Sequence, residues 1–469
     1  MPPPSSAASR DEPVIRDRGD ACPGALRLHA ADDGHLARIR IPGGLLTADA
    51  AAAVADAADR LGDGHLDLTS RGNAQLRGLG ASCGGELAAL LTAAGLLPAA
   101  AATHERVRNI VASPLSGLDR QGRPDVTPWV GALDRLLCAS GPAAALSGRF
   151  LFALDDGRGD VSSLAPDVHV LALKRGMAVL WTHDDTDAVA VGHQDAPRAA
   201  LTVARYFLDV VHEAGTKAWR VSELPVEQRP ESGELLKRLR ERGISAERAH
   251  GFRRRTGPGP RPGPVAGLDP DHVALSVLAP LGRLTSAQWR LLAATATAAA
   301  GTLRLTPWRG IVVPGVRAAT AADTLARLAD AGLVTAPGDP WENVSACTGR
   351  PGCAKALADV RADARAVVAR SGAAGGPDAP VPAAPALPVH WSGCERRCGH
   401  PRARAWVDLV AGPRGYGVTV AGPRAGHAVR EDVPATPEDL TAALAEADAE
   451  AAFHQPHPTQ HTQQPQRQM

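Results

Sequence analysis

The sequence contains one pattern twice, and this repeat limits the folds that the chain can adopt. Residues 44–79 and 282–316 each read as Leu-Thr, a helix-forming stretch, Gly-x-Leu-x-Leu-Thr and then Arg-Gly. Each copy continues into a second helical stretch that ends in Ala-Gly-Leu, at 94–96 and at 331–333. Because the order and the spacing agree in both copies, chance similarity in an Ala-rich sequence explains the match poorly. The chain is therefore predicted to contain two copies of one structural unit.

Local patterns predict the elements of each copy. Thr285 and Gln288 form a capping box ahead of an apolar-periodic run, and Thr47 can cap the first copy in the same way. Leucines that alternate with polar residues are typical of half-buried strands. The order strand–helix–strand–helix predicts an α+β class. The expected strands include Leu36–Ile41, Leu66–Leu68, Val273–Leu278 and Leu303–Leu305.

Length and charge exclude several broad classes. The 469 residues are enough for two to four domains. Lys and Arg number 51 against 50 Asp and Glu, and a net charge of +1 argues against a general binder of nucleic acid or of membrane surfaces. The N-terminus has no apolar signal region, and the longest apolar stretch, Leu87–Ala102, is too short for a membrane span. A cytoplasmic protein is expected.

Four of the seven cysteines are clustered as Cys347-x5-Cys353 and Cys394-x3-Cys398, and glycines flank both pairs. Four thiolates suit a soft metal centre, and a [4Fe–4S] cluster is the favoured interpretation. Structural zinc prefers spacings of two to four residues, which the first pair does not have. Unligated thiols or redox disulfides are the third alternative. The remaining cysteines, Cys22, Cys83 and Cys138, are interpreted as core or loop thiols.

A helix is expected to begin beside the first cysteine pair. Residues 354–370 form a helical stretch that Cys353 would open. A helix N-terminus at that point would lower the pKa of the thiol and stabilise an anionic cluster.

Several motifs resemble one enzyme superfamily. Asn343-x3-Cys347-x5-Cys353 with Ser392-Gly393-Cys394-x3-Cys398 resembles the cluster signature of the sirohaem sulfite and nitrite reductases, over roughly residues 24–450. Thr69-x-Arg71 with Gln75, and Arg108-Asn109, resemble its other motifs. The resemblance implies two tandem, pseudo-twofold-related copies of a ferredoxin-like half-domain, with an α/β cluster lobe. It also implies that Ser113 takes the place of Cys347 in the other half, and that Cys398 faces the substrate.

Within that superfamily the sequence looks most like the precorrin-3B synthases of aerobic cobalamin biosynthesis. The motifs are residues 109–119, Gly148-Arg149-Phe150 with the run 154–157, and Cys398-Gly-His-Pro401. The reductases present two arginines and a Lys-x-Lys pair to their oxyanion. An ungapped match puts Arg149 and Leu151 at the lysine pair, so one cation is missing.

The resemblance implies an oxidoreductase of the monooxygenase type. Such an enzyme uses O2 to hydroxylate precorrin-3A and to close a γ-lactone, with electrons delivered through a [4Fe–4S] cluster. It implies a non-haem iron beside the cluster, and an electron-donating reductase or ferredoxin as partner. The chain has no Gly-x-Gly-x-x-Gly dinucleotide motif, which agrees with an external donor. The alternatives are a sirohaem-dependent sulfite or nitrite reductase and a non-catalytic zinc- or tetrapyrrole-binding protein.

Arginines are the candidate substrate ligands, because an octacarboxylate tetrapyrrole needs several bidentate partners. The alternative interpretation of each arginine is a solvated surface side chain. For Asn73 and Gln75, the alternative is a polar group at a strand edge. Arg396 and Arg397 could neutralise the cluster or dock the donor, and His390 and His400 are candidate iron ligands. The predicted substrate-binding residues are Arg71, Asn73, Gln75, Arg77, Arg108, Arg149 and Arg309.

The repeat and the composition divide the chain into segments. Gly257–Pro264 is rich in Pro and Gly and is expected to form neither a ladder nor a helix, and a loop of similar composition covers Gly372–Pro388. The predicted segments are a flexible N-terminus (1–23), a first half-domain (24–104), a first reductase-type lobe without cluster (105–226), an exposed linker (227–267), a second half-domain (268–338), the cluster lobe (339–453) and a disordered tail (454–469).

Overall fold

The computed structural model describes residues 23–183, 186–250, 252, 254–373, 387–401, 405–422 and 427–453. Cys22, the expected tail and most of the loop 372–388 lie outside these ranges, as does nearly all of the expected flexible N-terminus. The chain divides into two compact units, residues 1–339 and 340–469, and each is described by itself.

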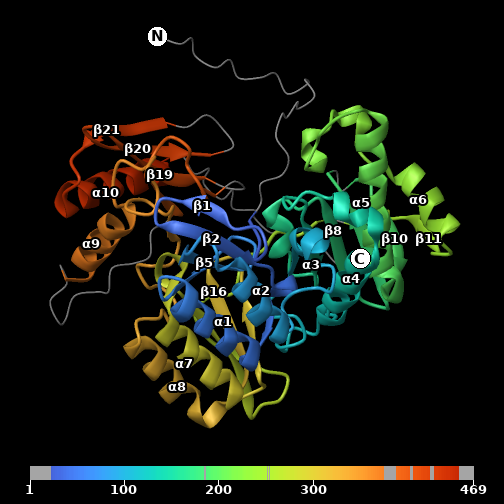
Figure 1. Ribbon diagram of the computed structural model, residues 1–469, viewed down its shortest axis with the longest axis horizontal. Helices are drawn as coiled ribbons and strands as arrows, with labels where there is room; N and C mark the ends of the chain where they lie inside the picture. The colour runs from blue at the N-terminus through green and yellow to red at the C-terminus, as the bar shows by residue number, and fades with distance from the viewer. Residues whose placement is uncertain are drawn as a thin grey trace, which may run out of the picture. The chain divides into compact units, whose positions relative to one another are not determined.

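The first unit contains two antiparallel five-stranded sheets (Figure 1). The first sheet has the order β1 (His29–Ala31), β2 (Gly34–Ile39), β5 (Ala74–Leu79), β4 (His65–Leu68) and β14 (Arg283–Thr285). The second has the order β12 (Gly263–Ala266), β13 (His272–Leu278), β16 (Gly310–Arg317), β15 (Thr302–Leu305) and β3 (Leu45–Thr47). The helices are α1 (Ala48–Leu61) and α2 (Gly84–Ala93) in the first copy, and α7 (Ser286–Thr297) and α8 (Ala321–Asp330) in the second.

The two copies exchange one short strand each. Strand β14 of the second copy pairs with β4, placing Leu284 opposite Leu66, and β3 of the first copy pairs with β15, placing Leu46 opposite Leu303. The hydrogen bonds from Ala48 N to Gly301 O and from Ser286 N to Gly64 O are both 2.9 Å long and are reciprocal. This exchange confirms the expected pseudo-twofold.

Glycine is required where the exchanged strands begin. Gly44 has a φ of +71°, and a Cβ there would lie 2.0 Å from the carbonyl oxygen of Leu305 in the other copy. A side chain at this position would therefore separate β3 from β15.

Helices α1 and α7 run side by side and close the core shared by the two copies (Figure 1). Trp289 is fully buried, and its Nε1 donates to the carbonyl oxygen of Ala51 at 2.8 Å. The capping box of Thr285 and Gln288 is present, and the Thr47 side chain accepts from Ala50 N, as predicted.

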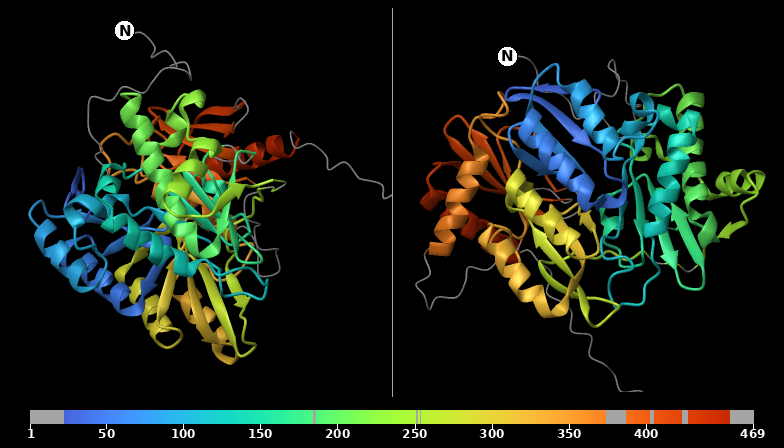
Figure 2. Two further views of the ribbon diagram at one scale, coloured as in Figure 1. Left: turned by 90° about the vertical axis from the view of Figure 1, so that its right-hand side faces the viewer. Right: turned by 60° about the horizontal axis from the view of Figure 1, so that its bottom comes forward.

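The lobe that follows the first copy contains a six-stranded sheet with one helical layer. Helices α4 (Thr127–Ala139) and α5 (Ala196–Glu213) pack against one face of this sheet (Figure 2). Strands β6, β7 and β8 are parallel and the remaining strands are antiparallel. The sheet order is β11 (Ala246–Arg248), β10 (Val189–Gly192), β9 (Met177–Trp181), β8 (Val168–Leu173), β7 (Phe152–Asp155) and β6 (Ile110–Ala112).

The second unit repeats the element order of this lobe. Its sheet has the order β17 (Val344–Ala346), β18 (Val389–Ser392), β19 (Trp406–Gly412), β20 (Gly415–Ala421) and β21 (His427–Val433), and its first three strands are parallel. Helix α9 (Val360–Ala373) follows the first strand as α4 follows β6, and α10 (Pro437–Phe453) follows the last strand as α5 follows β10.

The segment 227–267 is not the exposed linker that the sequence predicted. It contains α6 (Ser232–Glu241), adds β11 to the lobe sheet and adds β12 to the sheet of the second copy. Pro264 is tolerated because β12 is an edge strand. Gly257 N donates to Gly159 O at 3.0 Å, so the proline-rich stretch is tied down by its neighbours.

The remaining helical elements are short and connect the layers described above. They are α3 (Ala101–His104) and the 3-10 turns Pro42–Gly44, Glu105–Val107, Gly141–Ala145, Val161–Leu164, His193–Asp195, Val221–Glu223, Val226–Gln228, Pro280–Gly282 and Ala318–Thr320.

Candidate functional site

Both cysteine pairs of the second unit follow the carboxyl ends of neighbouring parallel strands. Cys347 comes directly after β17, and Cys394 comes two residues after the end of β18. Because the two strands are parallel, their carboxyl ends lie at one edge of the sheet. Cys347 N donates to Trp391 O at 2.9 Å, which extends the ladder as far as the first cysteine.

The two cysteine loops are in direct contact. Gly393 N donates to Cys347 Sγ at 3.2 Å, and Leu357 N donates to Gly393 O at 2.7 Å. A Cβ at Gly393 would lie 2.6 Å from the Cβ of Ala356, so no larger residue fits between the loops. The close packing of the two loops directs the amide of Gly393 toward the sulfur of Cys347, and such a hydrogen bond stabilises a thiolate.

Three of the clustered thiols act electrostatically on the fourth, Cys398. Burial raises the pKa of Cys398, and the neighbouring thiols of Cys347, Cys394 and Cys353 raise it further, while Arg396 opposes them. All four cysteines are free of disulfides. Thiolates of these four cysteines would repel one another, and a cationic group that they can ligate would remove that repulsion. The donor set therefore fits an iron–sulfur cluster.

The predicted helix beside Cys353 begins later than expected. Helix α9 starts at Val360, and the Asp359 side chain accepts from Ala362 N at 3.1 Å near its first turn. Residues 353–357 instead form a turn that bonds to Gly393 O, which holds them outside the helix. The prediction that Cys353 opens this helix is therefore wrong.

The two candidate histidine ligands are engaged by other groups. His390 is fully buried, with Nδ1 2.8 Å from Ser345 Oγ and Nε2 3.2 Å from the carbonyl oxygen of Cys398. His400 Nδ1 lies 2.7 Å from Pro401 O, and its ring stacks on Trp406. His390 thus anchors the second cysteine loop.

The ligands of the predicted non-haem iron are not identified. Within the described ranges, no group of three or more His, Cys, Asp or Glu side chains is arranged to hold one metal ion, and this includes the four cysteines. Of the two arginines in the second cysteine loop, Arg397 pairs with Asp408 at 2.6 Å and with Glu395.

The cluster-free lobe has a serine at the place of the first cysteine. Ser113 directly follows β6, and its N donates to Leu154 O at 3.1 Å, as Cys347 N donates to Trp391 O in the second unit. The expected equivalence of Ser113 and Cys347 therefore agrees with the topology.

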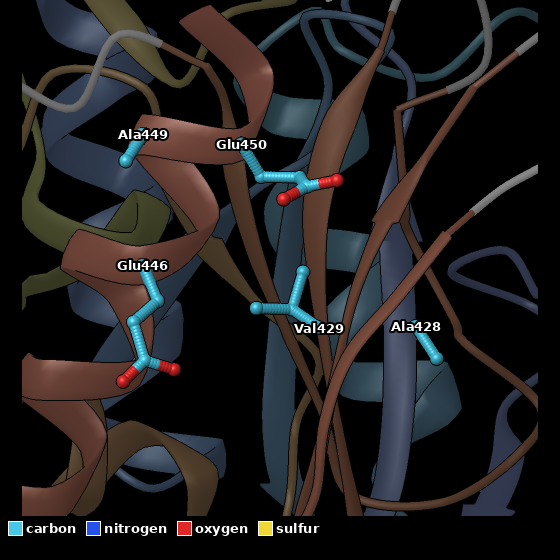
Figure 3. A pocket seen from close by; sticks show the side chains of 5 residues that line it. All are labelled: Ala428, Val429, Glu446, Ala449 and Glu450. Carbon is cyan, nitrogen blue, oxygen red and sulfur yellow. The ribbon is translucent and has the colours of Figure 1, made fainter. Parts of the chain in front are cut away.

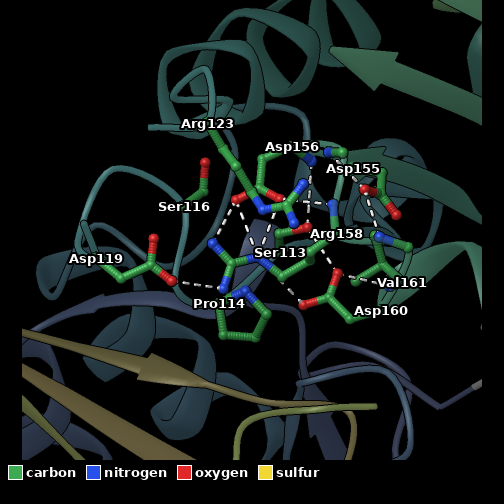
Figure 4. A network of polar contacts seen from close by, with 12 residues as sticks. Ser113, Pro114, Ser116, Asp119, Arg123, Asp155, Asp156, Arg158, Asp160 and Val161 are labelled. Carbon is green, nitrogen blue, oxygen red and sulfur yellow. Dashed lines mark hydrogen bonds and ion pairs between the residues drawn. The ribbon is translucent and has the colours of Figure 1, made fainter. Parts of the chain in front are cut away.

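Carboxylates and the guanidinium of Arg158 lie around Ser113 (Figure 4). Ser113 Oγ donates to Asp160 Oδ1 at 2.7 Å, and Arg158 pairs with Asp156 and Asp119 at 2.7 and 3.1 Å. Asp160 is fully buried, and burial raises its pKa to about 7, although the Ser113 hydrogen bond opposes the shift. A polar network thus fills the position that corresponds to the cysteine loops.

Two predicted substrate-binding arginines are committed to buried ion pairs. Arg108 is 7% exposed and donates to both oxygens of Asp134, at 2.7 and 2.8 Å, and to Leu96 O at 2.8 Å. Arg77 donates to both oxygens of Asp33 at 2.8 Å. Because a bidentate carboxylate already occupies each fork, these contacts fit a structural role and do not fit the predicted contact with substrate.

Arg71 and Arg149 meet on one loop. Arg71 Nη1 and Nη2 donate to the carbonyl oxygens of Gly148 and Arg149, each at 2.9 Å. Arg149 itself is exposed, and its guanidinium lies over the ring of Trp219, 4.9 Å from the centroid. Sequence reasoning did not single out Trp219, because no motif marks it.

The predicted amides lie on and beside β5. Asn73 is 2% exposed; its Oδ1 accepts from Ile41 N at 2.8 Å, whereas its Nδ2 is buried with no acceptor among the described residues. Gln75 is half-buried and accepts from Arg38 at 3.4 Å.

The Arg-Gly pairs that the two copies share in sequence, Arg71-Gly72 and Arg309-Gly310, are displaced by one residue in the structure. Arg309 N donates to Thr306 O as Gly72 N donates to Thr69 O, and the φ values of Arg309 and Gly72 are +62° and +65°. Trp308 therefore takes the place of Arg71 in the second copy, and Arg309 takes the place of Gly72.

Two hollows in the described part of the chain are lined by residues other than the predicted ones. One of about 470 Å³ lies between β21 and α10 and is lined by Ala428, Val429, Glu446, Ala449 and Glu450 (Figure 3). Another, of about 340 Å³, lies near Asp187 and Arg248.

Comparison with known proteins supports this description. The family described as nitrite/sulfite reductase ferredoxin-like half domain matches residues 29–94 and 266–331, one match in each copy of the repeat. A precorrin-3B synthase of Sinorhizobium sp. is 28% identical over 87% of this chain and 84% of its own length. A ferredoxin–nitrite reductase of Synechococcus elongatus is 27% identical over 78% of this chain and 74% of its own length.

A solved structure shares the fold. The Mycobacterium tuberculosis NirA protein has a TM-score of 0.62 at 20% identity, covering 92% of this chain and 82% of its own. The expected fold is thereby confirmed, and the family match with the two relatives confirms the resemblance to the nitrite and sulfite reductase superfamily. In the described part of the chain, no helix has the length and apolar character that crossing a membrane requires.

Proposed function

The chain carries two nitrite/sulfite reductase ferredoxin-like half domains, and we propose that it is an oxidoreductase of the precorrin-3B synthase type. Its substrates would be precorrin-3A and O2, and its products a hydroxylated γ-lactone and water. The ring would gain one oxygen atom from O2, and two electrons from the donor together with two protons would convert the other oxygen to water. The similarity to a precorrin-3B synthase over most of both chains supports this choice of reaction.

The burial of Leu151 is the observation that favours this branch over an oxyanion reductase. Leu151 is 2% exposed and packs with Val111, Ala153 and Val161 in an apolar cluster. An ungapped match puts it where the reductases carry the second lysine of their Lys-x-Lys pair. The position is therefore part of an apolar core, and a cation there would lose its hydration. A site that lacks this cation is less suited to a small oxyanion.

The four clustered cysteines would hold a [4Fe–4S] cluster, which supplies single-electron transfer when it is bound. Such a cluster binds each thiolate through a separate iron, so its ligands need not converge on one point. Gly393 N would stabilise the charge on Cys347, and His390 would hold the carbonyl of Cys398 in place. An external reductase or ferredoxin would supply the electrons, and a non-haem iron is proposed without assigned ligands.

Residues of the first unit would bind the substrate. Arg149 presents an exposed guanidinium, and Asn73 Nδ2 is a buried donor that lacks an acceptor within the described ranges, which makes both suited to ligand oxygens. Gln75 and Arg309 stay in the proposed set. Arg71 acts through the loop that it holds.

A sirohaem nitrite or sulfite reductase is the second candidate, supported by the similarity to the Synechococcus reductase. Anaerobic purification followed by an absorption spectrum and by iron and labile-sulfide analysis tests both. The proposal predicts a broad brown shoulder with about four sulfides and about five irons per chain, four in the cluster and one as the non-haem iron. Strong Soret and Q-type bands would favour the reductase, and zinc without sulfide would favour the non-catalytic alternative.

A further inference from the structure

The Arg149 side chain differs from the other predicted arginines in what its donors contact. In the part of the chain that the structure describes, no hydrogen bond uses its guanidinium, and the contact found for it is the face of Trp219. A cation over an aromatic face interacts with the ring electrons and not with a hydrogen-bond acceptor. The N–H donors of Arg149 are therefore available to an incoming group.

The loop that presents Arg149 is held at several points. Arg71 donates to the carbonyl oxygens of Gly148 and Arg149, and Asn109 Nδ2 donates to that of Gly148 at 2.8 Å. The backbone N of Arg149 donates to Ser147 Oγ at 3.0 Å. An exposed charge on so constrained a backbone loses little conformational freedom when it binds a ligand.

A buried carboxylate joins this loop to the segment of Trp219. Asp167 is buried; its Oδ2 accepts from Leu151 N and its Oδ1 from Val221 N, each at 2.8 Å. Arg220 Nε also donates to Asp167, at 2.6 Å. The residue two positions after Arg149 and the residue two positions after Trp219 are thus bound to one side chain, which keeps the cation over the ring.

A second arginine–aromatic pair in the same unit provides a comparison. The Arg238 guanidinium lies 4.4 Å from the centroid of the Tyr206 ring, but its donors are used by Asp209 and by Glu234. Stacking on an aromatic ring is therefore common to both pairs, and available donors distinguish Arg149.

We propose that Trp219 positions Arg149 to bind one carboxylate of the substrate through a bidentate pair. Trp219 is a positioning residue in this arrangement, and Arg149 is the residue that touches the ligand. The identification of the acid as a tetrapyrrole rests on the proposed function.

The test is the affinity for sirohydrochlorin, a metal-free tetrapyrrole with eight carboxylates, measured by calorimetry on the full chain. Arg149→Gln is expected to weaken binding about ten- to a hundredfold, because a charge-assisted pair is lost. Trp219→Leu is expected to weaken it about two- to fivefold, and Trp219→Phe to restore most of the loss. Arg238→Gln is the matched control and should bind as the unmodified protein does.

The outcomes separate this proposal from the proposed function. If the unmodified protein binds no sirohydrochlorin, both are overturned. If it binds, but Arg149→Gln or Trp219→Leu binds equally well with an unchanged melting temperature, only the positioning arrangement is overturned. Equal losses in Trp219→Phe and Trp219→Leu would also contradict it, because an aromatic face would then not be what Arg149 needs.

Discussion

Replacing Asp160 by Asn tests the structure of the cluster-free lobe through the pH dependence of its stability. Asp160 is fully buried beside Ser113, and burial raises its pKa to about 7 from 3.8 in the unfolded chain. The folded protein therefore holds one proton more than the unfolded chain between these two pH values. This contribution to stability is complete below pH 3.8 and is lost as the pH rises through 7.

The size of the effect follows from the shift. Each pKa unit corresponds to about 1.4 kcal/mol, so a shift of about three units corresponds to about 4 kcal/mol in total. Between pH 5 and pH 8 the unmodified lobe should lose about 3 kcal/mol that Asp160→Asn does not lose, because an amide does not ionise. Ser113→Ala removes a hydrogen bond that lowers the pKa of Asp160. The loss of stability should therefore occur at a higher pH in this variant.

Hydrogen exchange of the amides of β6 and β7 measures this pH-dependent stability within the lobe, because it reports the free energy of local opening there. The difference in opening free energy between the unmodified protein and Asp160→Asn should change by about 3 kcal/mol between pH 5 and pH 8. A difference that is constant over this range would refute the reasoning, since Asp160 would then be ionised in the folded protein.

Three further substitutions test the rest of the account. Cys353→Ser should abolish the visible absorption and the labile sulfide, whereas Cys138→Ser should change neither; a full cluster in Cys353→Ser would remove Cys353 from the ligand set. Leu151→Lys should lower the melting temperature, because it loses about 1.5–3 kcal/mol of apolar burial and buries a cation. The variant should gain no nitrite or sulfite reduction. A gain of that activity would contradict the choice of the precorrin-3B synthase branch. Arg108→Lys should lower stability by about 1.5–3 kcal/mol, because it breaks the fork to Asp134, and should change sirohydrochlorin affinity less than threefold; a tenfold loss would make Arg108 a substrate ligand.

Local signals predicted most of the fold. The capping box of Thr285 and Gln288 and the alternating leucines depend on neighbours in sequence, and both features are present in the structure. The exchange of β3 and β14 was not predicted, because a strand of three residues is too short to show a period of two. Composition misled at Gly257–Pro264, where an edge position allowed Pro264 to join a strand.

The candidate site was predictable where spacing carries the chemistry. The cysteine spacing singled out four residues, of which Cys347 and Cys394 follow the ends of neighbouring strands and all three partners act electrostatically on Cys398; they remain proposed ligands. The pairing of Arg108 with Asp134 joins residues 26 apart, and that of Arg77 with Asp33 joins residues 44 apart. No local pattern reveals such partners. Trp219 was missed for the same reason, since its contact with Arg149 depends on the fold.

Isotope transfer from O2 tests the proposed reaction most directly. Anaerobically purified protein would be given precorrin-3A, a reductant with an electron donor, and ¹⁸O2, and the product would be analysed by mass spectrometry. The proposal predicts a product that contains one ¹⁸O atom, and no consumption of nitrite or sulfite in parallel assays. Unchanged precorrin-3A together with reduction of nitrite or sulfite would contradict it.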